Sequence, residues 1–475
     1  MGVIKSFFKQ IAYILPEVEP PKKKISLRNR FIWSGIILIL YLIMGNIPLY
    51  GVRTGGQDWF AFLRVIFASS RGTLIELGIG PIVTAGLIMQ LLAGAEIIKF
   101  DFTDPEERGI FTAATKFLTI IVTIVEATAM IASGYLVLAS YSVSVVTIVF
   151  LQLVVATILV MLMDELVQKG WGLGSGISLF IAAGVAQQIF IRMFSPLTVR
   201  VDDEIQYFGA IPFIIQKALQ GDLQTTFMRT GNYPSLLGLI TTLAVIFILI
   251  YTEGMRIEIP ISHAQYRGIR GTYPVKLLYV SNIPIILAST LLADINMFAT
   301  FLWSRFNPNN QDPLMNLIVQ METTEGGGLR IVGGLLYYVT APTDIFQAMA
   351  DPIRSLTFVI TMIILAILFA VVWVEVGGLS SEKVAEQLVE SGMQIPGFRR
   401  RAYSINLVLK KYIPLVTVVG GFFVGVIAGV AQLLGVFGSG MGILLMVDIL
   451  MNYYQILMRE QFEELYPSLA RLVKI

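Results

Sequence analysis

Long runs of apolar residues, separated by shorter polar segments, dominate the pattern of this 475-residue chain. A helix that crosses a membrane needs about 20 mostly apolar residues. By that criterion the pattern predicts an all-α polytopic membrane protein with ten transmembrane helices. Their boundaries carry an error of about 2–4 residues. The predicted spans cover residues 31–49, 74–98, 109–137, 144–163, 174–190, 236–251, 275–293, 356–374, 413–433 and 442–457.

Composition also indicates a membrane protein and limits the chemistry that the chain can perform. Hydrophobic residues make up 56% of the chain and charged residues only 14%, against about 45–50% and 25% in soluble domains. Cysteine is absent and His263 is the one histidine, which excludes disulfides and argues against a metal site. No nucleotide-binding, zinc-protease or serine-hydrolase motif is present. We therefore expect no metal, no cofactor and no enzymatic activity.

The distribution of Lys and Arg predicts the orientation, because cytoplasmic loops carry an excess of both. A cytoplasmic N-terminus places most of the 34 basic residues inside, and ten spans return the C-terminus to that side. The inner loops 252–276 and 375–412 are long and basic. In the second, a Pro-Gly turn precedes three arginines, which suit an acidic partner or RNA phosphates. For most other basic residues, the excess of Lys and Arg that cytoplasmic loops normally carry explains their position.

Two segments are apolar but do not span. Residues 2–15 form an amphipathic pattern that predicts a helix in the cytoplasmic interface. Residues 57–69 lie outside, between the first two spans, and are too short to cross a bilayer. We expect this segment to be re-entrant or interfacial. Its apolar residues are Trp59, Phe60, Phe62, Leu63, Ile66 and Phe67.

Glycine and proline interrupt several predicted spans: GIGP at 78–81, GWGLGSGISLF at 170–180 and GSGMGILL at 438–445. Such breaks either pack helices closely or line an aqueous path. Glu126 and Asp448 are acids inside the spans. For Glu126 we favour a polar seam between helices over a proton or cation site. These residues alone favour a secondary transporter for a small solute over a protein-conducting channel, although broken helices are compatible with both.

The motifs also carry a resemblance. GIGP followed by small apolar residues and Gln90, GLGSGIS at 172–178, VSNIP at 280–284 and GSGMGILL are similar to the SecY family, in its archaeal branch. The resemblance covers essentially the whole chain and reverses the preference towards a passive protein-conducting channel. It implies two inverted-repeat halves, 31–193 and 236–457, that open like a clamshell about an external hinge at 194–235. Residues 1–30 and 458–475 are then cytoplasmic tails.

The resemblance implies roles for particular residues. An aliphatic ring would seal the pore, and 57–69 would be a plug that closes it from outside. A polar lateral gate would run between spans two and three and spans seven and eight, and basic loops would dock the ribosome. The ring residues would be Ile79, Val83, Ile177, Ile181, Ile286 and Leu445. The gate residues would be Thr84, Gln90, Glu126 and Asn282. The docking residues would be Arg267, Arg270, Lys276, Arg399, Arg400 and Arg401.

The same resemblance implies partners and a location. The expected partners are two small single-span subunits of the SecE (gamma) and beta types, and the ribosome with its RNA phosphates. Signal sequences, nascent chains and membrane lipids complete the set. The expected location is the cell (plasma) membrane, with translocation and lateral release of spans into the bilayer as the function.

Overall fold

A computed structural model describes most of the chain, and within the described residues it is mainly helical. Those residues are 8–10, 15–23, 25–53, 64, 67–94, 97–98, 100, 104–133, 135–201, 204–222, 224–229, 233–263, 270–280, 283–323, 329–342, 345–394 and 401–465. Nine of the described helices are long and apolar enough to cross a membrane, and α4 is apolar but has only 15 residues. These ten helices are α2 (Leu27–Met44), α4 (Gly80–Gly94), α5 (Pro105–Ala132), α6 (Val143–Leu166), α7 (Gly176–Phe194), α9 (Leu236–Glu253), α10 (Ile283–Phe306), α14 (Pro352–Val376), α16 (Ala402–Leu433) and α17 (Gly440–Leu465).

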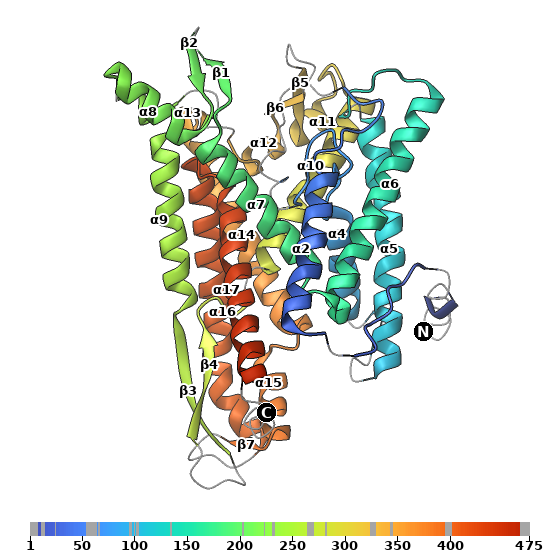
Figure 1. Cartoon of the computed structure of the whole chain (residues 1–475), viewed down its shortest axis with the longest axis vertical. Coiled ribbons are helices and arrows are strands. Elements are labelled where there is room, and N and C mark those ends of the chain that lie inside the picture. Colours follow the sequence, from blue (N-terminus) through green and yellow to red (C-terminus); the bar gives the residue numbers. More distant parts are fainter. Residues whose placement is uncertain are drawn as a thin grey trace.

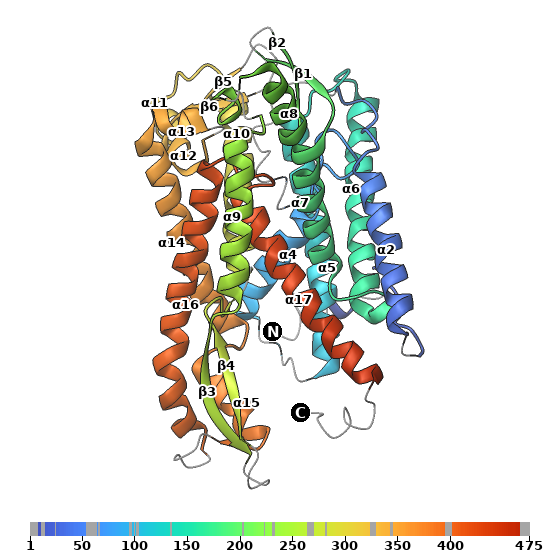
Figure 2. The ribbon, with the colours of Figure 1, turned by 60° about the vertical axis from the view of Figure 1, so that its left-hand side comes forward.

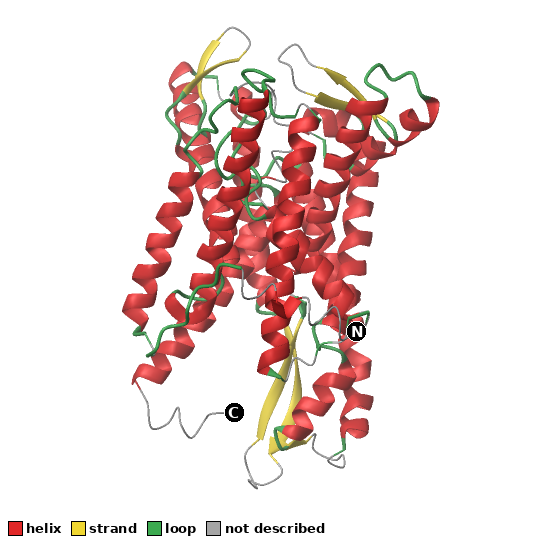
Figure 3. Ribbon diagram, turned by 90° about the vertical axis from the view of Figure 1, so that its right-hand side faces the viewer, coloured by secondary structure: helices red, strands yellow, loops and turns green. Residues whose placement is uncertain are grey.

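In the part of the chain that the structure describes, the connections between these helices contain short helices and three small antiparallel sheets, so the all-α expectation describes only the spanning part (Figure 3). The sheets pair β1 with β2, β4 with β3 and β3 with β7, and β5 with β6. The strands are β1 (Thr198–Val201), β2 (Glu204–Tyr207), β3 (Arg256–His263), β4 (Arg270–Lys276), β5 (Gln320–Thr323), β6 (Leu329–Gly333) and β7 (Met393–Gln394). The short helices are η1 (Val167–Trp171), α8 (Ala210–Gln220), η2 (Gln224–Thr226), α11 (Pro313–Ile318), α12 (Leu335–Val339), α13 (Ile345–Ala350) and α15 (Ser381–Glu390).

The long helices run side by side along the long axis of the molecule (Figures 1 and 2). The β3–β4 hairpin and α15 extend from one end, and the other two hairpins lie at the opposite end. Lys9 pairs with Glu106 at the start of α5 at 2.5 Å, and Arg30 in α2 pairs with Glu460 in α17 at 3.0 Å. The described N-terminal residues and the end of α17 therefore share one end of the bundle, as an even number of spans requires.

Several spanning helices begin just after a polar residue whose side chain caps the first turn. Asp104 precedes Pro105, and its carboxylate accepts a hydrogen bond from the backbone N–H of Glu106. Asp351 does the same before α14 by accepting from Arg354 N–H. Each side chain satisfies an amide that has no partner within the helix, and proline fits the first helical position because it lacks that amide.

The seventh predicted span, 275–293, is displaced in the structure. Residue Val275 belongs to β4, and α10 covers Ile283–Phe306. The apolar run continues from the strand into the helix, so hydropathy did not separate the two elements. Pro284 lies in the first turn of α10, where proline favours a helix start. In consequence Asp294, which the prediction left in an external loop, lies in the middle of a spanning helix.

Two other boundaries differ. The second span begins at Gly80 instead of 74, because Gly78 adopts a left-handed φ of 57° that a continuing helix does not allow. The ninth begins at Ala402 instead of 413, so Lys410 and Lys411 extend a helix beyond the apolar run.

Helices from the two halves of the sequence pack against each other at two interfaces. On one side α10 packs against α4 and α5, and on the other α17 packs against α7. One buried apolar cluster receives side chains from both halves. This cluster contains the candidate site.

Candidate functional site

The six side chains assigned to the pore ring lie together in the structure. Ile79, Ile181 and Leu445 are completely buried within the central apolar cluster. Partly buried side chains of Val83, Ile177 and Ile286 pack against the same cluster. The six come from the chain just before α4 and from α4, α7, α10 and α17. Residues separated by more than 350 positions thus converge on one apolar centre.

The GIGP motif lets a neighbouring segment lie against the start of α4. A Cβ at Gly78 would collide with the carbonyl oxygen of Phe67, and the left-handed φ also favours glycine. The backbone N–H of Ile79 donates to that same oxygen at 2.9 Å. Phe67 packs against the central cluster. The helix break therefore creates a backbone contact between the ring and the end of the 57–69 segment.

The end of that segment is also held by α2. The hydroxyl of Tyr41 donates to the carbonyl oxygen of Ala68, and the Tyr41 ring stacks on Phe180 of α7 with centroids 4.1 Å apart. Phe67 and Ala68 are thereby fixed among α2, α4 and α7. The other apolar residues predicted for the plug lie outside the described residues: Trp59, Phe60, Phe62, Leu63 and Ile66.

A buried polar cluster, here called the Arg64 cluster, forms around Arg64 of this segment. The Nη2 atom of Arg64 donates to Oε1 of Glu76 at 2.5 Å and to the hydroxyl of Tyr135 at 2.7 Å. The exposed fractions of the Arg64 and Glu76 side chains are 8% and 0%. Glu76 also accepts a hydrogen bond from the backbone N–H of Gly72. This cluster was not predictable from the sequence, because Tyr135 is distant in the chain and nothing in the pattern pairs it with Arg64.

The GLGSGIS glycines serve close packing. The carboxylate of Asp164, at the end of α6, accepts from the backbone N–H of Ile177 at 2.9 Å. A Cβ at Gly176 would lie 2.6 Å from the Asp164 Cα, so only glycine allows this approach. Tyr453 of α17 donates to the Leu173 and Ser175 carbonyls at 3.0 Å. Asp164, which no sequence pattern singled out, thus positions the helix that carries two ring residues.

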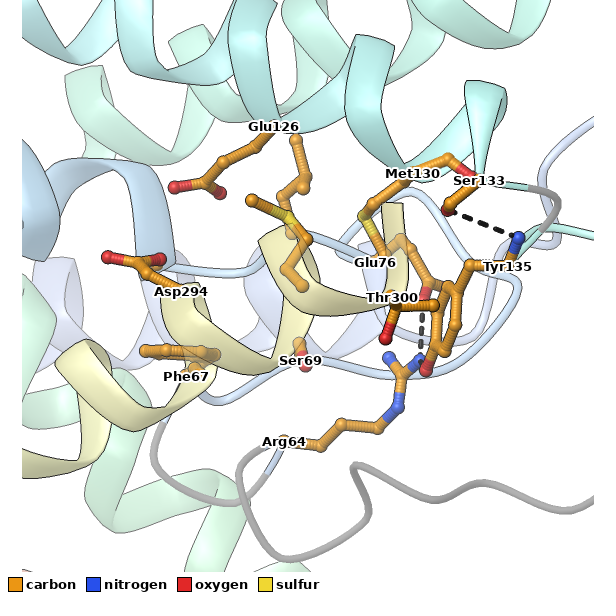
Figure 4. A pocket seen from close by; sticks show the side chains of 14 residues that line it. Arg64, Phe67, Ser69, Glu76, Glu126, Met130, Ser133, Tyr135, Asp294 and Thr300 are labelled. Atoms are coloured by element: carbon orange, nitrogen blue, oxygen red, sulfur yellow. Dashed lines mark hydrogen bonds and ion pairs between the residues drawn. The ribbon is translucent and has the colours of Figure 1, made fainter. Parts of the chain in front are cut away.

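A cavity of about 80 Å³ lies where α5 and α10 face each other. Glu126, which is 7% exposed, lines it together with Asp294. Figure 4 shows the two carboxyl groups directed toward one another. Thr84 of α4 donates from Oγ1 to Oδ2 of Asp294 at 3.4 Å. Of the predicted gate residues, Thr84 and Glu126 therefore each lie beside Asp294, which is an additional member of the seam.

The remaining predicted gate residues are placed differently. Gln90 lies further along α4 and is partly buried, and Asn282 lies outside the described residues. Asp448 of α17 is buried.

The two basic inner loops form a single structural unit. β3 pairs with β4 in one loop and with β7 from the other, through Ser262 opposite Gln394 and His263 opposite Met393. An apolar cluster that includes Ile259, Leu388 and Leu409 holds the hairpin against α15 and α16. Hydropathy gave no signal for this pairing.

The docking residues fall partly within this unit. Lys276 ends β4 with its Nζ 3.6 Å from Glu253, Arg270 begins β4, and exposed Arg401 immediately precedes α16. Arg267, Arg399 and Arg400 lie outside the described residues.

Comparison with known proteins gives one consistent result. The SecY family matches residues 73–454, and the family described as the plug domain of Sec61p matches residues 39–72. The protein translocase subunit SecY of Pyrococcus furiosus is 42% identical, with 96% of each chain covered. That of Aeropyrum pernix is 39% identical, with coverage of 100% of this chain and 99% of the relative.

Solved structures agree with the sequence matches. A structure of a protein-conducting channel is similar with a TM-score of 0.80 and 36% identity, covering 98% of this chain and 99% of that one. Sec61 in the canine ribosome–channel complex has a TM-score of 0.78 and 35% identity, with the same coverage. These matches leave no ground for the solute-transporter alternative. The chain belongs to the SecY family, whose members are channel-forming subunits of the protein translocase and multi-pass membrane proteins rather than enzymes.

Proposed function

We propose that the six clustered aliphatic side chains are the seal of the translocation pore in this channel. The observation that carries the proposal is their convergence from both halves of the chain on one buried centre. An aliphatic constriction resists ions because it excludes water. It yields to a passing polypeptide because it offers no strong binding site. The segment ending at Phe67 and Ala68, which contacts Ile79, is then the plug.

We further propose that the seam of α10 against α4 and α5 is the lateral gate, in the place where Thr84, Glu126 and Asp294 meet. Within a membrane, hydrogen bonds between helices are worth only about 0.6–2 kcal/mol each. The Thr84–Asp294 bond is long at 3.4 Å. Two carboxyl groups that face each other across the seam add little attraction. A seam held this weakly can part when an apolar signal sequence or membrane span packs between the helices.

The pore assignment is tested by cross-linking. A photoreactive residue at Ile79, Ile177 or Ile286 is expected to react with a nascent chain stalled in the channel. The matched control is Leu153, which is as buried as Ile79 but lies in a separate apolar cluster on α6. Strong cross-links at the three ring positions and none at Leu153 would support the pore. Equal cross-linking at all four positions, or none at the ring, would contradict it.

We also propose that the β4–β3–β7 unit and the arginines after it dock the ribosome. The similar Sec61 chain forms part of a canine ribosome–channel complex. The joined sheet holds strands from both basic loops together in one extension, which suits an extended phosphate surface.

Charge reversal tests the docking surface. Arg399→Glu is expected to weaken ribosome binding and to lower the slope of log affinity against log salt by about 1 for each phosphate that the arginine no longer neutralises. The control is Arg330→Glu, in the β5–β6 hairpin at the opposite end of the molecule. Binding measured by co-sedimentation over a salt series should change only for Arg399. An unchanged affinity and slope would exclude this arginine from the docking surface.

The remaining assignments follow from family membership. We propose that the chain acts in the plasma membrane with both termini cytoplasmic and residues 194–235 as the hinge between the halves. The partners would be small single-span subunits of the SecE (gamma) and beta types, with signal sequences and nascent chains as substrates. Exposed apolar side chains along the spans, such as Phe247 and Leu151, suit lipid or a partner span.

A further inference from the structure

Helix α8, in the connection between α7 and α9, turns a stripe of apolar residues away from the protein. On a helix at the surface of a water-soluble domain, the apolar stripe faces the protein and the polar side faces solvent. In α8 the apolar residues Ile211, Ile215 and Leu219 follow one another at four-residue spacing along one side. Ile215 is 56% exposed and Leu219 is 85% exposed. This side therefore points away from the protein.

The opposite side of α8 carries polar groups that the protein satisfies. Lys217 is buried and pairs with Glu204 of β2 at 2.6 Å. Gln216 donates from Nε2 to the carbonyl of Ile205 and accepts from the backbone N–H of Tyr207, both at 3.0 Å. The ion pair lowers the pKa of Glu204, mainly through its hydrogen bond to Lys217. Gln216 and Lys217 thus join α8 to the β1–β2 hairpin.

Arg229 fastens this helix to its neighbours. Its guanidinium lies 3.8 Å from the centre of the Phe213 ring of α8 and donates to the carbonyls of Tyr207 and Pro234. Burial lowers the pKa of Arg229 to about 10, so the group remains charged at neutral pH. Because Pro234 lies two residues before Leu236, where α9 begins, these contacts tie α8 to the start of a spanning helix.

The outward stripe continues the apolar surface of the spans. Phe190 and Phe194, at the adjacent end of α7, are exposed, and so is Leu197 in the following turn. On α9, which α8 also contacts, Ile240 and Leu243 are exposed. Figure 1 shows α8 projecting sideways from the end of the bundle opposite the β3–β4 hairpin, close to where α9 begins. Exposed apolar side chains gathered on neighbouring elements in this way mark an interaction surface.

We infer that α8 is an interfacial anchor that lies in the membrane leaflet opposite the β3–β4 hairpin, with Ile215 and Leu219 inserted among the acyl chains. A helix with an apolar side in this position binds at the boundary between headgroups and acyl chains. Through Arg229 the anchor holds the start of α9, and hence the connection between the two halves, at a set depth. The inference needs only that the chain spans a membrane and does not depend on the pore ring.

The natural chain contains no cysteine, so a single introduced cysteine carries a nitroxide label at one known place. We would label Ile215→Cys and Leu219→Cys in the complete translocase, reconstituted in phosphatidylcholine–phosphatidylglycerol vesicles. Collisions with oxygen, which concentrates in lipid, are compared with collisions with a water-soluble nickel chelate. Gln224→Cys, in the exposed η2 turn of the same connection, is the water reference. Leu151→Cys, on the exposed side of α6, is the lipid reference.

The anchor predicts that oxygen collisions exceed nickel collisions at positions 215 and 219, as at 151, with the reverse at 224. Nickel collisions that dominate at 215 and 219 would place the helix in water and overturn the inference. Low collision rates with both reagents would mean that protein, such as a partner span, covers the stripe, and would also overturn it. The readout requires no translocation, so its failure is distinct from failure of the proposed pore.

Discussion

Replacing Ile79 with serine is expected to raise ion leakage through the resting channel about fivefold, because a hydroxyl in the ring offers water a hydrogen bond worth about 1 kcal/mol. Ile79 is completely buried at the centre of the apolar cluster. An apolar constriction blocks ions by excluding water, so a single polar group lowers the barrier. The measurement is the conductance of the purified translocase in planar bilayers without a translocating substrate. The same variant should also accept defective signal sequences more readily.

Two controls separate loss of the seal from loss of folding. Ile79→Leu keeps an aliphatic side chain in the ring and should remain as tight as the parent. Leu153→Ser introduces the same hydroxyl into the buried cluster on α6, away from the ring. If Leu153→Ser leaks as much as Ile79→Ser, general destabilisation explains the leak. If Ile79→Ser conducts no more than the parent, Ile79 does not belong to the seal.

Glu76→Ala is expected to lower the free energy of unfolding by about 3–5 kcal/mol, since it leaves the buried Arg64 guanidinium without its carboxylate. The pair is 2.5 Å long and almost fully buried. Because Arg64 lies within the proposed plug segment, the variant should also leak ions at rest. Thermal unfolding of the purified complex measures the first effect, and bilayer conductance measures the second.

The combined variant Arg64→Met with Glu76→Leu should recover most of the stability, because no buried charge is left uncompensated. The matched control is Glu258→Ala, which breaks an ion pair with Arg256 of similar length, 3.0 Å, whose side chains are 47% and 57% exposed. An exposed pair contributes about 0–1 kcal/mol. A Glu76→Ala variant no less stable than Glu258→Ala would show that the Arg64 cluster does not hold this region together.

The residues of the proposed gate were only partly predictable from the sequence. Glu126 stands out in the sequence as an acid within an apolar run, and in the structure it lines the cavity where α5 faces α10. Its role in a polar seam stays a prediction. Asp294 was missed because the predicted seventh span ended one residue before it. Hydropathy merged the end of β4 with α10, since strand and helix are both apolar there. The Pro284 signal for a helix start was present and would have moved the span to include Asp294.

The structure of the two basic inner loops was also only partly predictable from the sequence. Their charge density is visible in the sequence and predicted a cytoplasmic surface. The β3–β7 pairing that joins them was not predictable, because β7 has two residues and lies more than 120 positions beyond β3. Strand pairing at that separation is decided by the packing of α15 and α16 against the hairpin.

Sequence alone determined that the chain spans a membrane and which residues form about ten spanning helices. It also showed that glycine and proline interrupt some of these helices. These are local properties: hydropathy sums over neighbouring residues, and φ above zero is a property of single positions such as Gly78. The motifs further identified the family. Only the tertiary structure decided which broken ends meet, because contacts such as Ile79 with Phe67, Arg64 with Tyr135 and Asp164 with Ile177 depend on how helices pack. It also showed that α8 turns its apolar side outward, since a periodic pattern specifies an amphipathic helix but not the direction that its apolar side faces.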